Sequence, residues 1–260
     1  MKAGAARVLL TGASGGIGRT MALALRQAGA QVMGVGRGAA GPDGMAWVRA
    51  DLNAPQGPAS VAAAAADWRA NVVVHAAGVP AFGALADINA SRIEPVLQAN
   101  LLAPMLLTQA LLPRLLQLPR AQLVFVGSAL GRIGLPGFSV YGASKAGLHG
   151  FAEALRRELA DTAVRVQILG PRSTRTGFNG AAVEAYNRAT GTAMDEPEAV
   201  AAALLKLIDS EAAEAFIGYP ERWAVRLNGV LGTRLDGSFA KHRRSLASAA
   251  TPPATPGTAT

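Results

Sequence analysis

Two residues four positions apart, Tyr141 and Lys145, are the pair in this sequence best suited to proton transfer. Side chains at this spacing lie on one face of a helix, so an ammonium group can sit beside the phenol. A free tyrosine titrates at about 10, and a nearby positive charge lowers that pKa by stabilising the phenolate. The pair could then serve as a general acid and base. The same spacing also occurs by chance in exposed helices. The surrounding sequence is therefore needed to distinguish a catalytic pair from a chance one.

Ser128 is a third polar candidate for the same chemistry. It directly follows an apolar run at 123–127 that is typical of a buried strand. Its hydroxyl could hydrogen-bond the substrate oxygen that exchanges a proton with Tyr141.

A glycine-rich turn, Thr-Gly-Ala-Ser-Gly-Gly-Ile-Gly at 11–18, follows the first apolar run and precedes a helical stretch. Glycine allows a tight turn and lets main-chain N–H groups approach a pyrophosphate, which the N-terminus of the next helix attracts. A flexible loop is the alternative, but the strand before and the helix after favour a dinucleotide site. The expected contacts are Gly12, Ser14, Gly15, Gly16, Ile17 and Gly18.

The end of the second predicted strand indicates which dinucleotide binds. NAD sites ordinarily place a carboxylate there for the ribose hydroxyls, whereas this sequence has Arg37. Its guanidinium can form charge-assisted bonds to a 2′-phosphate, which favours NADP(H) over NAD(H), although a surface arginine is the alternative. Asp51 and Leu52, after the third strand, are expected near the adenine, and Asp51 could instead form a turn.

The elements that must position these residues follow from the apolar pattern. Strands are predicted at 7–10, 31–35, 46–50, 71–75, 122–127 and 164–169, and helices at 17–28, 59–68, 93–116 and 141–160. This alternation predicts an α/β fold with a single Rossmann-type, doubly wound parallel sheet and helices on both faces. Runs such as 72–74 are continuously apolar, as expected for strands covered on both sides.

The later part of the chain is less regular. Residues 172–196 are polar and contain glycine, and a helix at 197–210 and a strand at 216–218 are predicted after them. Because ligands bind beyond the carboxyl ends of parallel strands, we expect 172–196 to form a lid over the substrate. The domain is expected to span 1–244. Residues 245–260 contain only Ser, Leu, Ala, Thr, Pro and Gly, and are expected to be disordered.

The glycine-rich turn, Ser128, Tyr141 and Lys145, in this order and spacing, resemble the short-chain dehydrogenase/reductase family over about 7–176. The resemblance implies that Tyr141 protonates a carbonyl oxygen during reduction and that Ser128 orients this oxygen. It also implies that Lys145 lowers the tyrosine pKa and binds the nicotinamide ribose. Asn100 matches the family's fourth catalytic position, which holds a water in a proton relay to the lysine.

Two further family segments are present with substitutions. His75-Ala76-Ala77-Gly78 resembles Asn-Asn-Ala-Gly at the adenine ribose, with both asparagines replaced. The resemblance therefore implies main-chain contacts from Ala77 and Gly78 alone, and we expect His75 to be a packed strand-end residue.

The segment 171–176, Pro-Arg-Ser-Thr-Arg-Thr, resembles the Pro-Gly-x-x-x-Thr segment that holds the nicotinamide. The resemblance assigns cofactor contacts to Pro171 and Thr176. Arg172 replaces the glycine, and both it and Arg175 could bind an acidic substrate or the pyrophosphate, or point into solvent.

Composition narrows the function classes. Half of the 260 residues are hydrophobic and none is cysteine, which excludes disulfides, thiolate zinc sites and cysteine nucleophiles; no metal site is predicted. The formal charge of +8 favours anionic partners, yet no finger, basic zipper or aromatic platform supports specific nucleic-acid binding. The basic segment at 221–244 forms either a solvated end or a docking surface; its basic residues are Arg222, Arg226, Arg234, Lys241, Arg243 and Arg244.

The start of the chain has no apolar region followed by a cleavage site, so we expect no secretory signal and a cytoplasmic protein. The leucine-rich stretch at 96–116 is interrupted by polar residues and prolines, which predicts a buried helix and no transmembrane segment. A later apolar stripe favours packing against the protein's own pocket over docking to a partner or membrane; it comprises Trp223, Leu227, Val230 and Leu231.

These features predict an NADP(H)-dependent oxidoreductase acting on a partly apolar carbonyl or secondary alcohol, as a small molecule or bound to a carrier. A 3-oxoacyl thioester is one such substrate, since a basic surface attracts an acidic carrier. The alternative is a dinucleotide-binding sensor without turnover, whose expected sign would be loss of Tyr141 or Lys145. The family resemblance implies a homo-oligomer, either a tetramer or a dimer formed through the helices that contain Ile93 and Tyr141.

Overall fold

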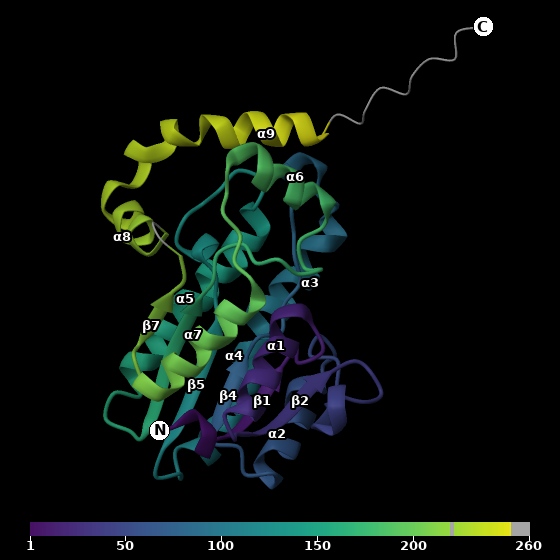
Figure 1. Ribbon diagram of the computed structural model, residues 1–260, viewed down its shortest axis with the longest axis vertical. Coiled ribbons are helices and arrows are strands. Elements are labelled where there is room, and N and C mark those ends of the chain that lie inside the picture. The colour runs from purple at the N-terminus through teal and green to yellow at the C-terminus, as the bar shows by residue number, and fades with distance from the viewer. Residues whose placement is uncertain (219–220, 251–260) are drawn as a thin grey trace, which may run out of the picture.

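The computed structural model describes residues 1–218 and 221–250 (Figure 1). Within these residues, one parallel sheet has the strand order β3-β2-β1-β4-β5-β6-β7. The predicted Rossmann-type fold is therefore confirmed. The strands are β1 (Arg7–Thr11), β2 (Gln31–Gly36), β3 (Ala46–Arg49), β4 (Val72–His75), β5 (Ala121–Val126), β6 (Val164–Gly170) and β7 (Glu214–Phe216).

The order of the strands reverses at β1, which pairs with β2 on one side and with β4 on the other. Thr11, the last residue of β1, is in register with Val35 and with His75. In parallel sheets the crevice for a ligand lies beyond the carboxyl ends of the strands at such a reversal. The glycine-rich turn begins at this point.

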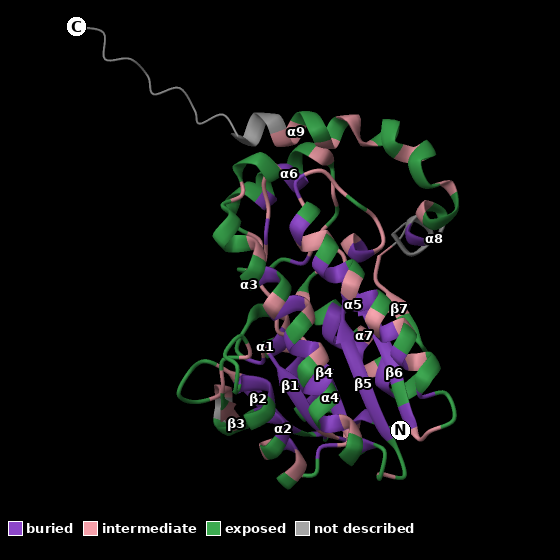
Figure 2. Cartoon of the chain, turned by 180° about the vertical axis from the view of Figure 1, so that it is seen from behind, coloured by how far each residue is buried: buried purple, intermediate pink, exposed green. Residues whose placement is uncertain are grey.

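Helices cover both faces of the sheet because its strands carry apolar side chains on both sides (Figure 2). One face packs against α1 (Gly16–Gln27) and α7 (Pro197–Ser210). The other packs against α2 (Gly57–Asp67), α4 (Ala103–Leu115) and α5 (Ser139–Glu158). Each predicted helix agrees with the structure to within about two residues at either end, except the long one at 93–116.

That long helix consists of three consecutive parts. α3 (Ile93–Leu97) leads into a π-helical turn (Gln98–Leu102), and α4 continues from it. Among the described residues, Ala90–Leu115 is the one helix apolar and long enough to cross a membrane, by length and composition only. Leu107, Leu111 and Leu115 are buried against the sheet, which is the arrangement of a core helix and agrees with the predicted burial.

The segment 172–196, expected to be a lid, contains a helix, α6 (Ala181–Thr190), whose Val183 and Tyr186 are buried. Two details of the later part of the chain differ from the expectation. The last strand, β7, lies two residues earlier than the predicted 216–218. Residues 245–250 are not disordered, because they belong to α9 (Ala240–Ala250), while 251–260 lie outside the described residues.

The C-terminal segment covers the end of the molecule that lies beyond the sheet. α8 (Glu221–Leu231) is followed by a 3₁₀ helix (Gly232–Phe239) and by α9, which crosses over α6 (Figure 1). Lys241, one of the basic residues here, donates a hydrogen bond to the main-chain oxygen of Thr190 at 3.0 Å. This basic segment is thus joined to the lid.

Candidate active site

A cavity of about 810 Å³ opens beyond the carboxyl ends of the strands. The structure brings nearly all of the sequence-predicted site residues to its wall, although they come from seven separate segments of the chain. Asn100 is buried behind this wall. The predicted residues that line the cavity are Gly12, Ser14, Gly15, Gly16, Ile17, Gly18, Arg37, Asp51, Leu52, Ala77, Gly78, Ser128, Tyr141, Lys145, Pro171 and Thr176.

The glycine-rich turn packs so closely that side chains would obstruct it. Gly12 has a φ of +70°, and a Cβ there would lie 2.8 Å from the Cα of Ala77. A Cβ on Gly16 would lie 2.6 Å from the Cβ of Thr176, and one on Gly18 would collide with the carbonyl oxygen of Gly12. The turn is therefore a cradle whose floor is main chain, as a bound pyrophosphate requires.

The start of α1 is suited to an anion. Its N-cap is Gly15, no side chain caps it, and no acidic residue lies in its first turn. The first main-chain N–H groups of a helix lack intrahelical partners and carry a partial positive charge. The residues around this helix end line the cavity, so a phosphate group would fit here.

Arg37 and Asp51 lie at the β2 and β3 edge of the cavity, and both are exposed. Asp51 accepts a hydrogen bond from the main-chain N–H of Asn53 at 3.0 Å. It therefore makes the local turn contact that was one of its two expected uses, and it also faces the cavity.

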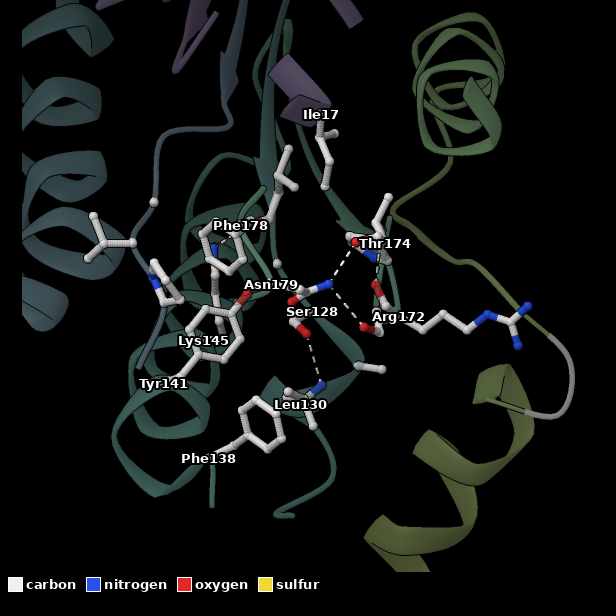
Figure 3. Close-up of a pocket in the computed structure, with 18 of the residues that line it drawn as sticks. Ile17, Ser128, Leu130, Phe138, Tyr141, Lys145, Arg172, Thr174, Phe178 and Asn179 are labelled. Atoms are coloured by element: carbon white, nitrogen blue, oxygen red, sulfur yellow. Dashed lines mark hydrogen bonds between the residues drawn. The ribbon is translucent and has the colours of Figure 1, made fainter. Parts of the chain in front are cut away.

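Ser128, Tyr141 and Lys145 meet at the centre of the cavity (Figure 3). Ser128 follows β5, and its Oγ accepts a hydrogen bond from the main-chain N–H of Leu130 at 3.1 Å. The ammonium group of Lys145 donates to the main-chain oxygen of Val126 at 2.9 Å and lies 5.8 Å from the centre of the Tyr141 ring. The hydroxyl of Ser128, the phenol of Tyr141 and the ammonium group of Lys145, which can all exchange or share a proton, thus line the same part of the cavity.

Burial shifts the pKa values of Tyr141 and Lys145. It raises the pKa of Tyr141 to about 12, while a hydrogen bond with Ser128 opposes the rise. Burial also lowers the pKa of Lys145 to about 8. The expected lowering of the tyrosine pKa is therefore not present in this structure, because desolvation of the phenol dominates and the ammonium group is directed to the oxygen of Val126.

Asn100 lies in the π-helical turn and acts as a tether. Its Oδ1 accepts from the main-chain N–H of Val79 at 2.8 Å, and its Nδ2 donates to the oxygen of Val79 and to Oγ of Ser144, both at 3.0 Å. A Cβ on Gly78 would lie 3.0 Å from Asn100 Oδ1 and 3.7 Å from Lys145 Nζ. The asparagine therefore joins the loop after β4 to α5 close to the lysine.

His75, the last residue of β4 and the first of the family segment at 75–78, is a core residue. His75 is buried, lies 3.0 Å from Thr108 Oγ1 through its Nε2, and stacks on Phe125. Burial lowers its pKa to about 3. The ring is neutral at pH 7 and packed at the strand end, as expected.

The two arginines of the lid pair with carboxylates at the opposite end of the same segment. Arg172 lies 2.7 Å from Asp195, with both side chains largely buried, and Arg175 lies 2.9 Å from Glu196, with both exposed. The main-chain N–H of Arg175 also donates to the oxygen of Asp195 at 2.9 Å. These contacts close the base of the lid, so a substrate carboxylate is not needed to explain either arginine.

Sequence reasoning missed two groups of residues at the site. His149 accepts a hydrogen bond from the main-chain N–H of Ser128 at 3.3 Å, and its position two helical turns after Tyr141 was the available signal. Residues from the loop before α5, Asn228 of α8 and residues of the 3₁₀ helix also line the cavity. Of the predicted apolar stripe, Leu227 lines the cavity as expected, whereas Val230 is 82% exposed and the Trp223 side chain lies outside the described part of the chain.

Comparison with known proteins agrees with this geometry. Residues 6–187 match the family model described as short chain dehydrogenase. Dehydrogenase/reductase SDR family member 7B from Rattus norvegicus is 30% identical over 197 residues, which are 68% of this chain and 61% of that protein. The chain thus spans about three fifths of that relative's length. Ketoacyl reductase HetN from Nostoc sp. is 31% identical over 225 residues, covering 81% of this chain and 77% of the relative.

Solved structures share the fold. A short-chain dehydrogenase from Streptomyces avermitilis aligns with a TM-score of 0.76 at 26% identity, covering 90% of this chain and 98% of that one. A short-chain dehydrogenase from Burkholderia cenocepacia in complex with NADP aligns with a TM-score of 0.80 at 21% identity, covering 92% and 99%. With the family model matched over more than half of its length, this protein belongs to the short-chain dehydrogenase/reductase family of oxidoreductases.

Proposed function

We propose that this protein is an NADP(H)-dependent oxidoreductase that interconverts a carbonyl and a secondary alcohol. The observation that carries the proposal is the position of Ser128, Tyr141 and Lys145 in the same cavity as the glycine-rich turn. NADPH bound along that cavity would supply the hydride. The close-packed turn and the uncapped start of α1 fit its pyrophosphate.

Tyr141 is the proton donor in this proposal. With a pKa of about 12, its phenol is protonated at neutral pH, which is the form that donates to a carbonyl oxygen. Ser128 Oγ, on the strand side of the same cavity, orients that oxygen by a hydrogen bond. Lys145, which carries its proton below about pH 8, places a positive charge beside the group that becomes a phenolate.

Arg37 supports the choice of NADP(H). Its exposed guanidinium lines the cavity near the end of β2. It can therefore receive a 2′-phosphate through charge-assisted hydrogen bonds. One of the solved relatives binds NADP.

The test combines binding with turnover. NADPH and NADH are titrated into the purified protein, and NADPH oxidation is followed with a panel of ketones, aldehydes and a 3-oxoacyl thioester. We expect NADPH to bind at least tenfold more tightly than NADH, Arg37→Asp to remove this preference, and Tyr141→Phe to abolish turnover while NADPH still binds. Binding without turnover on the whole panel would support the sensor alternative, and absence of dinucleotide binding would contradict both.

Assembly and location are part of the same proposal. We infer a homo-oligomer, dimer or tetramer, because Leu97, Leu102 and Leu106 on the α3–α4 helix remain partly exposed. Light scattering on wild type and on Leu106→Asp tests this, with a smaller assembly expected for the variant. A cytoplasmic location and a substrate that is either small or carrier-bound complete the proposal.

A further inference from the structure

Phenylalanine is concentrated at one end of the cavity. Four of the seven phenylalanines of the chain line it, although only 5% of all residues are aromatic. They come from four segments: the loop after β4, the loop before α5, the lid and the 3₁₀ helix. We call this group the aromatic chamber; it comprises Phe82, Phe138, Phe178 and Phe239.

The chamber starts beside the proposed proton donor. The Phe178 ring meets the Tyr141 ring edge to face, with 5.9 Å between their centres, and Figure 3 shows these rings and Phe138 around the same cavity. Phe82 and Phe138 lie 4.9 Å apart. A carbonyl carbon held beside Tyr141 would therefore point one of its substituents at these rings.

The buried side chain of Tyr186 packs against two of the rings, Phe82 and Phe138. Tyr186 is 2% exposed, and its ring lies 5.2 Å from Phe82 and 5.7 Å from Phe138. Its hydroxyl donates to the main-chain oxygen of Pro136 at 3.0 Å. The ring positions are thus set by packing, yet all four chamber phenylalanines are only half-buried, which leaves apolar surface for a ligand to cover.

The C-terminal segment forms one side of the chamber. Leu227, Leu235 and Phe239 line the cavity from this side. Asn228 fastens α8 to the body of the protein by donating to the main-chain oxygen of Arg132 at 2.9 Å. Because the lining residues of this segment are largely apolar and α8 is attached to the domain, a substituent in the chamber would lose part of its contact with water.

Charge is scarce at this end of the cavity. His242 is a lining residue whose pKa is lowered by burial and by the neighbouring Lys241, so its ring is neutral at pH 7. Arg172 lies at 2.7 Å from Asp195. Within the described residues, the remaining charged groups of the wall lie beside Tyr141 or at the β2 and β3 edge. An ionised substituent would lose its hydration here without gaining a partner.

We propose that the aromatic chamber binds the larger substituent of the substrate and that this substituent is an uncharged aromatic ring. This inference rests on the proposed function and names its substrate class: aryl ketones and the corresponding secondary alcohols. Rings from several directions offer both faces and edges to another aromatic ring, which favours such a ring over a flexible chain of equal area.

The substrate test uses the full-length protein with saturating NADPH and three methyl ketones. Phenyl methyl ketone and cyclohexyl methyl ketone are similar in size, while 2-butanone leaves the chamber nearly empty. We expect kcat/KM for the phenyl compound to exceed that for the cyclohexyl compound by about tenfold and that for 2-butanone by about 100-fold. Equal values, or a preference for an anionic ketone or a 3-oxobutanoyl thioester, would overturn the inference and leave the oxidoreductase proposal intact.

Matched variants connect the preference to the chamber. Phe138→Leu and Phe239→Leu should each lower the ratio of kcat/KM for phenyl methyl ketone over 2-butanone by about fivefold to tenfold. Phe151→Leu is the control, because Phe151 packs on Phe125 at the sheet and should leave the ratio unchanged. An unchanged ratio in both chamber variants would contradict the proposal.

Calorimetry provides a measurement that does not depend on turnover. In the presence of NADP⁺, phenyl methyl ketone should bind saturably to wild type and about tenfold more weakly to Phe138→Leu. If NADP⁺ binds and the ketone does not, only the chamber inference fails. If NADP⁺ itself does not bind, both the chamber inference and the proposed function fail.

Discussion

The main-chain N–H of Ser128 donates a hydrogen bond to Nε2 of His149 at 3.3 Å. The imidazole is 1% exposed, and it occupies space that glycine leaves open, because a Cβ on Gly131 would lie 2.9 Å from its Cδ2 and one on Gly127 would collide with the ring. Burial, with the charges of Arg132 and Lys145, lowers the pKa of His149 to about 4. The ring is therefore neutral at pH 7 and able to accept this bond.

We predict that His149 positions Ser128 without touching the substrate. His149→Phe should lower kcat by about tenfold and leave the Kd for NADPH unchanged, because the serine loses its anchor while the cofactor cradle is intact. His149→Gln, whose side-chain oxygen can still accept the bond, should restore most of the activity. Equal losses in the two variants at unchanged thermal stability would contradict the positioning role.

The pKa of Lys145 predicts how the reaction depends on pH. Burial lowers it to about 8, so the ammonium group is lost as the pH rises through that value. For carbonyl reduction, kcat/KM should fall above about pH 8 with a tenfold loss per pH unit, since this parameter reports the ionisation of the free enzyme. A profile that stays flat up to pH 10 would show that the charge of Lys145 is not required.

The same buried ammonium group should cost stability. Its folded-state pKa of about 8 lies below the ordinary value of 10.5, so the penalty is complete below pH 8 and disappears as the pH rises to about 10.5. Lys145→Met should therefore raise the free energy of unfolding at pH 7, by at most roughly 3.5 kcal/mol at about 1.4 kcal/mol per pKa unit. Denaturant unfolding at pH 7 and pH 10.5 measures this, and a gain that persists unchanged at pH 10.5 would point to packing as its cause.

Two adjacent glycines provide a matched test of the cofactor cradle. Gly16→Ala would bring a Cβ to 2.6 Å from the Cβ of Thr176, whereas Gly15→Ala would only approach the oxygen of Gly12 at 3.4 Å. We expect Gly16→Ala to weaken NADPH binding by at least tenfold and Gly15→Ala to weaken it by less than threefold. Fluorescence titration measures both, with circular dichroism as the check on folding. Equal affinities would show that Thr176 yields and is not part of a fixed cradle.

The two ion pairs at the base of the lid differ in burial, so they should contribute differently to the stability of the protein and of the lid. The side chains of Arg172 and Asp195 are 17% and 12% exposed, against 61% and 63% for Arg175 and Glu196. Asp195→Asn should destabilise the protein by about 2 to 4 kcal/mol and accelerate proteolysis within 172–196, because the largely buried guanidinium of Arg172 loses a carboxylate that contacts it at 2.7 Å. Glu196→Gln, the control, should cost less than about 1 kcal/mol. Similar proteolysis rates for the two variants would mean that the buried pair does not hold the lid.

The parts of this protein that the sequence predicted are those encoded by local pattern. Continuous apolar runs marked the strands of the sheet, and the glycine-rich turn and the four-residue spacing of Tyr141 and Lys145 indicated the site. Parallel strands then place their carboxyl ends at one edge, which explains why residues as distant as Arg37 and Thr176 line one cavity. The elements follow from the period of the apolar residues, whereas the roles of the site residues were implied by the family resemblance.

Other features depend on contacts between distant segments, and only the tertiary structure decided them. The expected lowering of the Tyr141 pKa was wrong because burial is a property of the whole site, and the bond between His149 and Ser128 joins a helix to a strand end. One side of the aromatic chamber comes from Leu235 and Phe239 of the 3₁₀ helix, a segment for which the sequence predicted no element. Local sequence patterns, together with the family resemblance, therefore indicated the fold and the chemistry of the central site, whereas long-range packing determined protonation, positioning and the shape of the substrate chamber.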